Sequence, residues 1–174
     1  TTIYNNIVKD IEKMKLPYRN FLKSIYAQYE KEIKLYPDSL SFSSYGMKGS
    51  LILKIYNALR IAKSIYRNKN LKDKDLILSA ILLKYLGRIK QYKYNIVFSD
   101  SDISKNENCF ILSRDIIKDL SKNNKYLTKS MVMELIDIIL YDNNQKSDKN
   151  PKGAIISTIY KLEKSISLNQ KLEL

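Results

Sequence analysis

The 174-residue sequence contains no histidine and no tryptophan, and it has only one cysteine, three prolines and four glycines. Without histidine, the chain lacks the commonest metal ligand and the commonest general base. A single cysteine, Cys109, excludes an internal disulfide and any zinc site built from several cysteines, so we expect a reducing, cytoplasmic location. The scarcity of glycine and proline argues against an architecture of strands and turns. No apolar run reaches the roughly 18 residues needed to cross a bilayer, so we expect no membrane span.

Positive charge is abundant and unevenly distributed. The net charge is +13, and the stretch from Lys48 to Lys93 contributes +10 of it, with twelve basic residues against two acidic ones. This concentration favours an anionic partner, with nucleic acid first and an acidic membrane surface second. Tyr56, Tyr66 and Tyr92 lie in the same stretch and are candidates for stacking on the bases of a single strand. The alternative is a lysine-rich, solvated surface that reflects an AT-rich coding sequence.

Apolar residues recur at helical spacing along most of the chain, which predicts an all-α protein of about seven helices. We predict one domain over 1–174, with a pair of helices in 1–36 and a core in 49–168. Pro17 suits the first turn of the second helix, and Thr128 is expected to begin a later one. The expected helices cover residues 3–15, 17–36, 49–67, 75–89, 108–121, 128–140 and 153–168.

Between the expected helices the sequence turns polar. Pro37 and Asp38 end the second helix and open a serine-rich loop. The range 92–107 is polar and aperiodic, so we predict a loop there, in which Ile96, Val97 and Phe98 could turn inward.

The stretch 75–89 is apolar on most sides of a helical wheel, which predicts a helix buried at the centre of the domain. Asp73 or Asp75 is a plausible N-cap for it, and Gly87 is expected to end it, as glycine commonly does. The residues from Asp75 to Arg88 read Asp-Leu-Ile-Leu-Ser-Ala-Ile-Leu-Leu-Lys-Tyr-Leu-Gly-Arg. This frame resembles the signature helix of HD-domain phosphohydrolases, Asp-Leu-Leu-x-Ala-x-x-Leu-His-Asp-Ile-Gly-Lys. Lys84 and Tyr85 stand where the family has its metal-ligating His-Asp pair.

Further landmarks in the same order resemble the HD domain of YhaM-type 3′→5′ exoribonucleases. A family loop of the form His-His-x-Tyr corresponds to residues 42–45, and the Gly-Gly-Leu that follows it corresponds to the helix start at Gly49. The positions that match the family's metal ligands here hold Lys54 (or Leu53, if the preceding loop is one residue longer), Lys84, Tyr85, Cys109, Asp142, Asn143 and Lys161.

The resemblance implies an HD-like fold without the family's chemistry. HD enzymes hold divalent metals with imidazole and carboxylate groups, and the metals activate water and neutralise phosphate charge. Only Asp142 and Cys109 remain as potential ligands, and oxygen and sulfur prefer different cations. We therefore predict a pseudoenzyme with no catalytic residue, no metal and no cofactor. A residual phosphohydrolase around Asp142 and Cys109 is the least favoured interpretation.

Three of the lost ligands are lysines, Lys54, Lys84 and Lys161, and in the family's fold these positions converge on one pocket. The resemblance thus suggests that ammonium groups replace the metal charge and still bind a phosphate group, a nucleotide or single-stranded nucleic acid. Arg88, Arg60 and Lys63 are the other candidate anion-binding residues. Clustered like charges are unfavourable without an anion, so the alternative is that the lysines extend to solvent and that the scaffold binds only a protein partner. For Cys109, at a helix start, the alternatives are a stabilised thiolate and a buried structural thiol.

Overall fold

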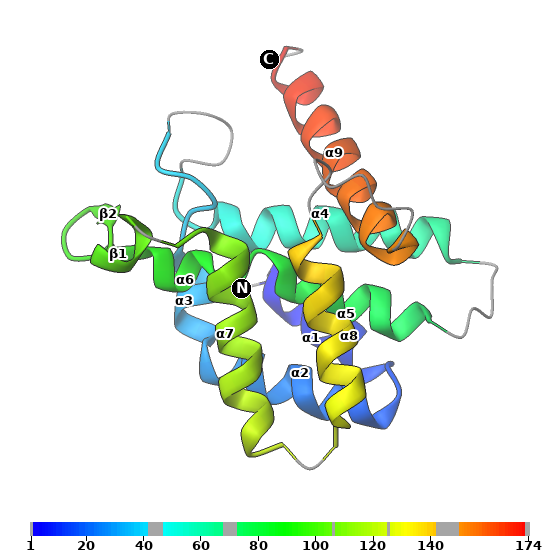
Figure 1. Cartoon of the computed structure of the whole chain (residues 1–174). Coiled ribbons are helices and arrows are strands. Elements are labelled where there is room, and N and C mark those ends of the chain that lie inside the picture. Colours follow the sequence, from blue (N-terminus) through cyan, green and yellow to red (C-terminus); the bar gives the residue numbers. More distant parts are fainter. Residues whose placement is uncertain are drawn as a thin grey trace.

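The computed structural model describes residues 2–41, 47–67, 73–105, 107–124, 126–141 and 150–172, without the side chains of 104, 105 and 168–172. Helices dominate these ranges, and the all-α prediction is confirmed (Figure 1). The helices are α1 (Thr2–Glu12), α2 (Leu16–Gln28), α3 (Glu30–Leu35), α4 (Ser50–Ile65), α5 (Lys74–Lys84), α6 (Arg88–Gln91), the 3-10 turn η1 (Asp102–Lys105), α7 (Cys109–Lys122), α8 (Lys129–Leu140) and α9 (Pro151–Leu172). Two short strands, β1 (Tyr92–Tyr94) and β2 (Phe98–Asp100), pair between α6 and η1.

Helix α5 lies at the centre of the molecule, as its apolar composition predicts. Every residue from Leu76 to Lys84 is buried. The helix packs against α2, α4, α7, α8 and α9, so neighbours surround it on all sides. The N-terminal helices belong to the same core, because α1 packs on α2 and α4 while α2 packs on α5. In the described ranges, no helix combines the length and the apolar character needed to cross a membrane.

Several local signals are confirmed in detail. Proline lies in the first turn of α2, and the side chain of Thr128 accepts a hydrogen bond from the amide of Met131 at 3.3 Å. Asn108 caps α7 in the same way, by accepting from the amides of Phe110 and Ile111. Each cap satisfies backbone donors that a helix start leaves unpaired.

Other predicted boundaries are wrong. The helix expected over 17–36 is divided at Tyr29, which has φ −111° and ψ 23°, into α2 and α3. Of the two residues expected to cap α5, Asp73 does occupy the N-cap position, but its side chain makes no capping hydrogen bond. Asp75 lies inside the first turn, where its carboxylate accepts a hydrogen bond from the amide of Lys15 at 2.9 Å.

Gly87 does not end α5 as a left-handed C-cap. The helix already ends at Lys84, and Gly87 has the ordinary right-handed φ of −56°. The reason for glycine is the close approach of α7: a Cβ on Gly87 would lie 2.0 Å from the carbonyl oxygen of Cys109. The Gly87 amide also donates to the hydroxyl of Ser113 at 2.7 Å, and that hydroxyl donates to the carbonyl of Lys84 at 2.9 Å.

The loop predicted over 92–107 is wrong in two respects. Residues 92–100 form an antiparallel hairpin in which Tyr94 pairs with Phe98 across a short loop. Ile96 and Val97 do not turn inward, since their exposed fractions are 90% and 70%. Phe98 is half-buried.

Candidate functional site

A hollow lies where α4, α5, α6, α7 and α9 meet the segment that follows α3. Its volume is about 620 Å³, within the usual range for small-molecule sites. Among the described residues that line it, five are basic, one is acidic and four are aromatic. They are Lys54, Lys84, Arg88, Lys161 and Lys164, then Asp38, then Tyr85, Phe110, Tyr141 and Tyr160, together with Ser39, Ser41 and Ser157.

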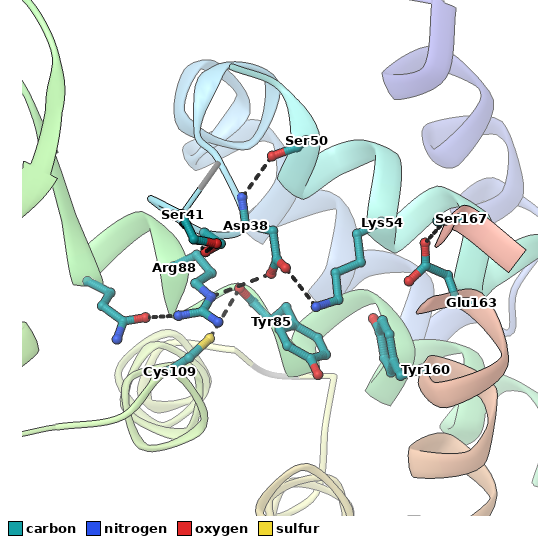
Figure 2. Close-up of polar contacts among 12 residues, drawn as sticks. Asp38, Ser41, Ser50, Lys54, Tyr85, Arg88, Cys109, Tyr160, Glu163 and Ser167 are labelled. Carbon is teal, nitrogen blue, oxygen red and sulfur yellow. Dashed lines mark hydrogen bonds and ion pairs between the residues drawn. The ribbon is translucent and has the colours of Figure 1, made fainter. Parts of the chain in front are cut away.

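Asp38 is the one carboxylate of this described lining, and two cations hold it. The ammonium of Lys54 donates to Oδ2 at 2.7 Å, and the Nε atom of Arg88 lies 3.5 Å from Oδ1. The exposed fraction of Asp38 is 4%, so the ion pairs lie in a largely water-free part of the wall. Figure 2 shows the carboxylate between the two cations, with Tyr85 and Tyr160 on the side of Lys54.

The backbone around Asp38 is fixed by the start of α4. The Asp38 amide donates to the hydroxyl of Ser50 at 3.0 Å, and the amide of Gly49 donates to the carbonyl of Leu35 at 2.9 Å. Gly49 has φ +75°, a conformation that glycine adopts without a steric penalty. The end of α3 and the start of α4 are therefore fastened together, and this holds Asp38 beside Lys54, one turn along α4.

Lys84 has the most buried ammonium group of the pocket, and its side chain is only 3% exposed. Its Nζ atom donates to the carbonyls of Ile139 and Tyr141, at 3.0 and 3.2 Å. These carbonyls belong to the C-terminal end of α8, where helices leave acceptors unpaired and where positive charge is favourable. Lys84 thus stabilises the end of α8 and also places a positive charge behind the pocket wall.

Aromatic rings form another part of the wall. The Tyr85 ring packs edge-on against Phe110 and Tyr160, with centroid separations of 5.4 and 4.6 Å. The Lys54 ammonium lies 3.7 Å from the centroid of Tyr85, a favourable cation–π position. Burial, followed by the nearby carboxylate of Asp38, raises the pKa of Tyr85 well above its ordinary value. The phenol is therefore protonated at neutral pH and is not a nucleophile there.

Lys161 and Lys164 project from α9 at the mouth of the same pocket. Both side chains are exposed, and neither forms an ion pair with any residue that the structure describes. Among the described residues, a ligand that contacts these two ammonium groups has no salt bridge to displace.

The structure brings four of the six proposed anion-binding residues together. Lys54, Lys84, Arg88 and Lys161 line one pocket. Arg60 instead lines a separate hollow of about 320 Å³ between α4 and α9, and Lys63 pairs with Asp10 at 2.6 Å. The basic stretch from Lys48 to Lys93 is therefore divided among several faces.

Of the remaining candidates, Asp142 and Asn143 lie outside the described residues, as do positions 42–45. Tyr66 and Tyr92 are buried and cannot offer a ring face to a base, which contradicts their predicted stacking role, while Tyr56 is half-buried. In the described ranges no group of three or more cysteine, aspartate and glutamate side chains is placed to hold a metal ion.

Cys109 is a buried thiol beside Tyr85, whose carbonyl accepts its weak hydrogen bond at 3.5 Å. Burial raises the pKa of this thiol to about 11, although Arg88 nearby acts in the opposite direction. The stabilised thiolate is therefore the wrong alternative, and the neutral structural thiol is the right one.

We expect Cys109 to react with Ellman's reagent at pH 8 at least about a hundredfold more slowly in the native protein than in denaturant, because the thiolate fraction falls with the raised pKa and the sulfur is covered. Absorbance at both conditions measures the two rates. Equal rates would mean that the thiol is accessible and ionised in the folded chain.

Sequence reasoning missed Asp38, which it took only as the end of a helix. A signal was present: between Glu32 and Asp73, Asp38 is the only acidic residue in a strongly basic stretch. A lone carboxylate in such surroundings is a natural partner for a cation that the fold buries.

Comparisons of the chain with protein-family models, with curated proteins and with solved structures each found no match. The HD resemblance therefore stays a prediction.

Proposed function

We propose that this protein binds a small phosphate-containing ligand in the pocket between α4, α5 and α9, as an HD-like module without catalytic activity. The observation that carries the proposal is the lining: five basic side chains and four rings around a hollow of about 620 Å³, with Asp38 as the acidic residue among the described lining. Lysine and arginine side chains recognise phosphate oxygens through charge-assisted hydrogen bonds. The rings offer apolar faces to the rest of such a ligand.

The charge of the lining supports an anionic ligand. Asp38 offsets part of the charge of Lys54 and Arg88, to which it is paired. Lys161 and Lys164 add two more positive charges at the mouth. Like charges in one partly enclosed hollow repel each other more strongly than in water, and a bound anion relieves that repulsion.

A small ligand is favoured over a long strand of nucleic acid. An extended strand needs a continuous basic track with exposed rings, whereas Arg60 and Lys63 face hollows other than the pocket. Tyr66 and Tyr92 are buried.

Thermal unfolding with inorganic pyrophosphate, adenosine monophosphate and adenosine tests the proposal. At about one hundred times the dissociation constant, a ligand stabilises by about 2.7 kcal/mol, which corresponds to roughly 5–10 °C for a chain of this size. We expect this rise with the two phosphate compounds and not with adenosine. If none of the three compounds raised the melting temperature, the proposal would be wrong and the role as a scaffold for a protein partner would replace it.

The double substitution Lys161→Ala/Lys164→Ala should weaken pyrophosphate binding about tenfold by calorimetry, because it removes two charge-assisted contacts at the mouth. The matched control is Lys118→Ala/Lys129→Ala, which removes the same charge from exposed positions on α7 and α8. An equal loss in both variants would assign the binding to overall charge and not to the pocket.

The absence of catalysis has its own assay. We expect no phosphate release from adenosine monophosphate in the presence of Mn²⁺. Hydrolysis that disappears in Asp142→Ala would contradict the pseudoenzyme proposal.

A further inference from the structure

The tip of the β1–β2 hairpin exposes two adjacent aliphatic side chains. The exposed fractions of Ile96 and Val97 are 90% and 70%, so the side chain of Ile96 is almost fully exposed to solvent. Single exposed apolar residues are common on protein surfaces, but two β-branched residues at the end of a projecting hairpin form a compact apolar point. Figure 1 shows this hairpin at the edge of the molecule, away from the helical body.

The hairpin stem is anchored, which keeps the tip pointing outward. Phe98 packs edge-on against Tyr36 at a centroid separation of 5.0 Å, and its ring is tilted against that of Tyr94 at 4.7 Å. The ammonium of Lys48 donates to the hydroxyl of Tyr94 at 2.9 Å and also lies over its ring. The aromatic residues of the stem thus pack on the body, while the aliphatic residues of the tip do not.

Two lysines lie on the stem of the hairpin between its base and its tip. Lys93 is exposed on β1, and Lys48 contacts Tyr94, the last residue of that strand. The acidic residues Asp100 and Asp102 lie at the opposite end, since Asp100 pairs with Tyr92 at the base. Met47, next to Lys48, is a further exposed apolar side chain at 73%.

We propose that this hairpin docks the protein on an anionic lipid bilayer, with Ile96 and Val97 inserted among the acyl chains and Lys48 and Lys93 at the headgroups. A hairpin with an apolar tip and lysines on its stem is complementary to a membrane interface, because apolar burial and attraction to anionic lipid both favour binding there. The sugar–phosphate backbone of a nucleic acid would match the lysines but not the aliphatic tip. The proposal does not depend on the pocket, so either can fail alone.

Co-sedimentation at low salt tests the docking. The vesicles are phosphatidylcholine alone or phosphatidylcholine with about a third of phosphatidylserine, an anionic lipid. We expect binding to the anionic vesicles, weakened about tenfold or more by Ile96→Ser/Val97→Ser and about fivefold by Lys93→Gln. The matched control Ile65→Ser/Met133→Ser changes two apolar residues that are each 49% exposed on other faces, and it should bind normally. All four of these tip and control side chains are exposed, so circular dichroism should show an unchanged fold.

A fluorophore at the tip measures insertion directly. Because the Cys109 thiol is buried, V97C can be labelled selectively with an environment-sensitive dye, with I65C as the control. We expect the emission of the V97C label, and not that of the I65C label, to shift to shorter wavelength on anionic vesicles. Insertion would be wrong if Ile96→Ser/Val97→Ser bound the vesicles as tightly as the unmodified protein and the emission of the V97C label did not shift. It would also be wrong if the unmodified protein did not bind the vesicles at all. Self-association that the tip variant abolishes, without vesicle binding, would assign the tip to a second copy of the chain and also overturn the proposal.

Discussion

Replacing Gly87 with alanine should lower the free energy of unfolding by about 4 kcal/mol, a large effect that is typical of a steric clash inside a packed core. The new Cβ would lie 2.0 Å from the carbonyl oxygen of Cys109, 2.7 Å from the amide nitrogen of Ser113 and 2.9 Å from a carbon of Leu112. Two of these neighbours are backbone atoms of α7, which cannot rotate aside as a flexible side chain can. Relief requires α7 to move away from α5 and α6.

Chemical denaturation measures this cost, and Gly49→Ala is a useful comparison. At Gly49 the penalty is mainly backbone strain at φ +75°, because the nearest atom to a new Cβ is at 3.2 Å. Strain of that kind costs about 1 kcal/mol. If the two alanine variants were equally stable, the close packing of α7 on Gly87 would be wrong.

Replacing Asp38 with alanine should cost about 3–5 kcal/mol, the usual result of removing one partner from a buried ion pair. Lys54 and Arg88 would keep their charges in a pocket wall where the carboxylate had been 2.7 and 3.5 Å away. The matched control is Asp119→Ala, which breaks an exposed pair with Lys122 at 2.9 Å. That variant should unfold at the temperature of the unmodified protein, because exposed pairs contribute little.

The Asp38 variant also has a distinctive dependence on added anions. Phosphate can occupy the space that the carboxylate leaves and can neutralise the two cations. We therefore expect inorganic phosphate to restore part of the lost melting temperature in Asp38→Ala, beyond any effect that sodium chloride of equal ionic strength produces. A deficit that is identical in both salts would mean that the wall closes over the cavity and admits no anion.

The predictable parts of the fold were those with a local cause. Apolar residues on all sides of α5 require burial wherever the helix lies, and Thr128 begins α8 through a contact only three residues away. The division at Tyr29 and the hairpin at 92–100 lack such signals, since neither break carries a glycine or proline. Both follow from how the body packs, in the second case through Phe98 on Tyr36.

The candidate site divides in the same way. Lys54, Lys84, Arg88 and Lys161 could be grouped from the resemblance of their positions, and they do line one pocket. The roles of the members could not be foreseen, because they depend on distant partners. Lys84 donates hydrogen bonds to the carbonyls at the end of α8, and Lys54 donates to the carboxylate of Asp38, which precedes it by 16 residues. Only the spatial arrangement separates these from the solvent-facing lysines of α9.

The complete burial of α5 has a consequence for synthesis on the ribosome. Two of its packing partners, α2 and α4, precede it in the chain, while α7, α8 and α9 follow it. When α5 emerges, it can cover only part of its apolar surface, and the rest stays exposed until α7, α8 and α9 have been translated. Exposed apolar surface of this kind is what makes incomplete chains aggregate and what chaperones bind. The nascent protein should therefore be most vulnerable, and most dependent on chaperones, between the release of α5 and the arrival of α8 and α9.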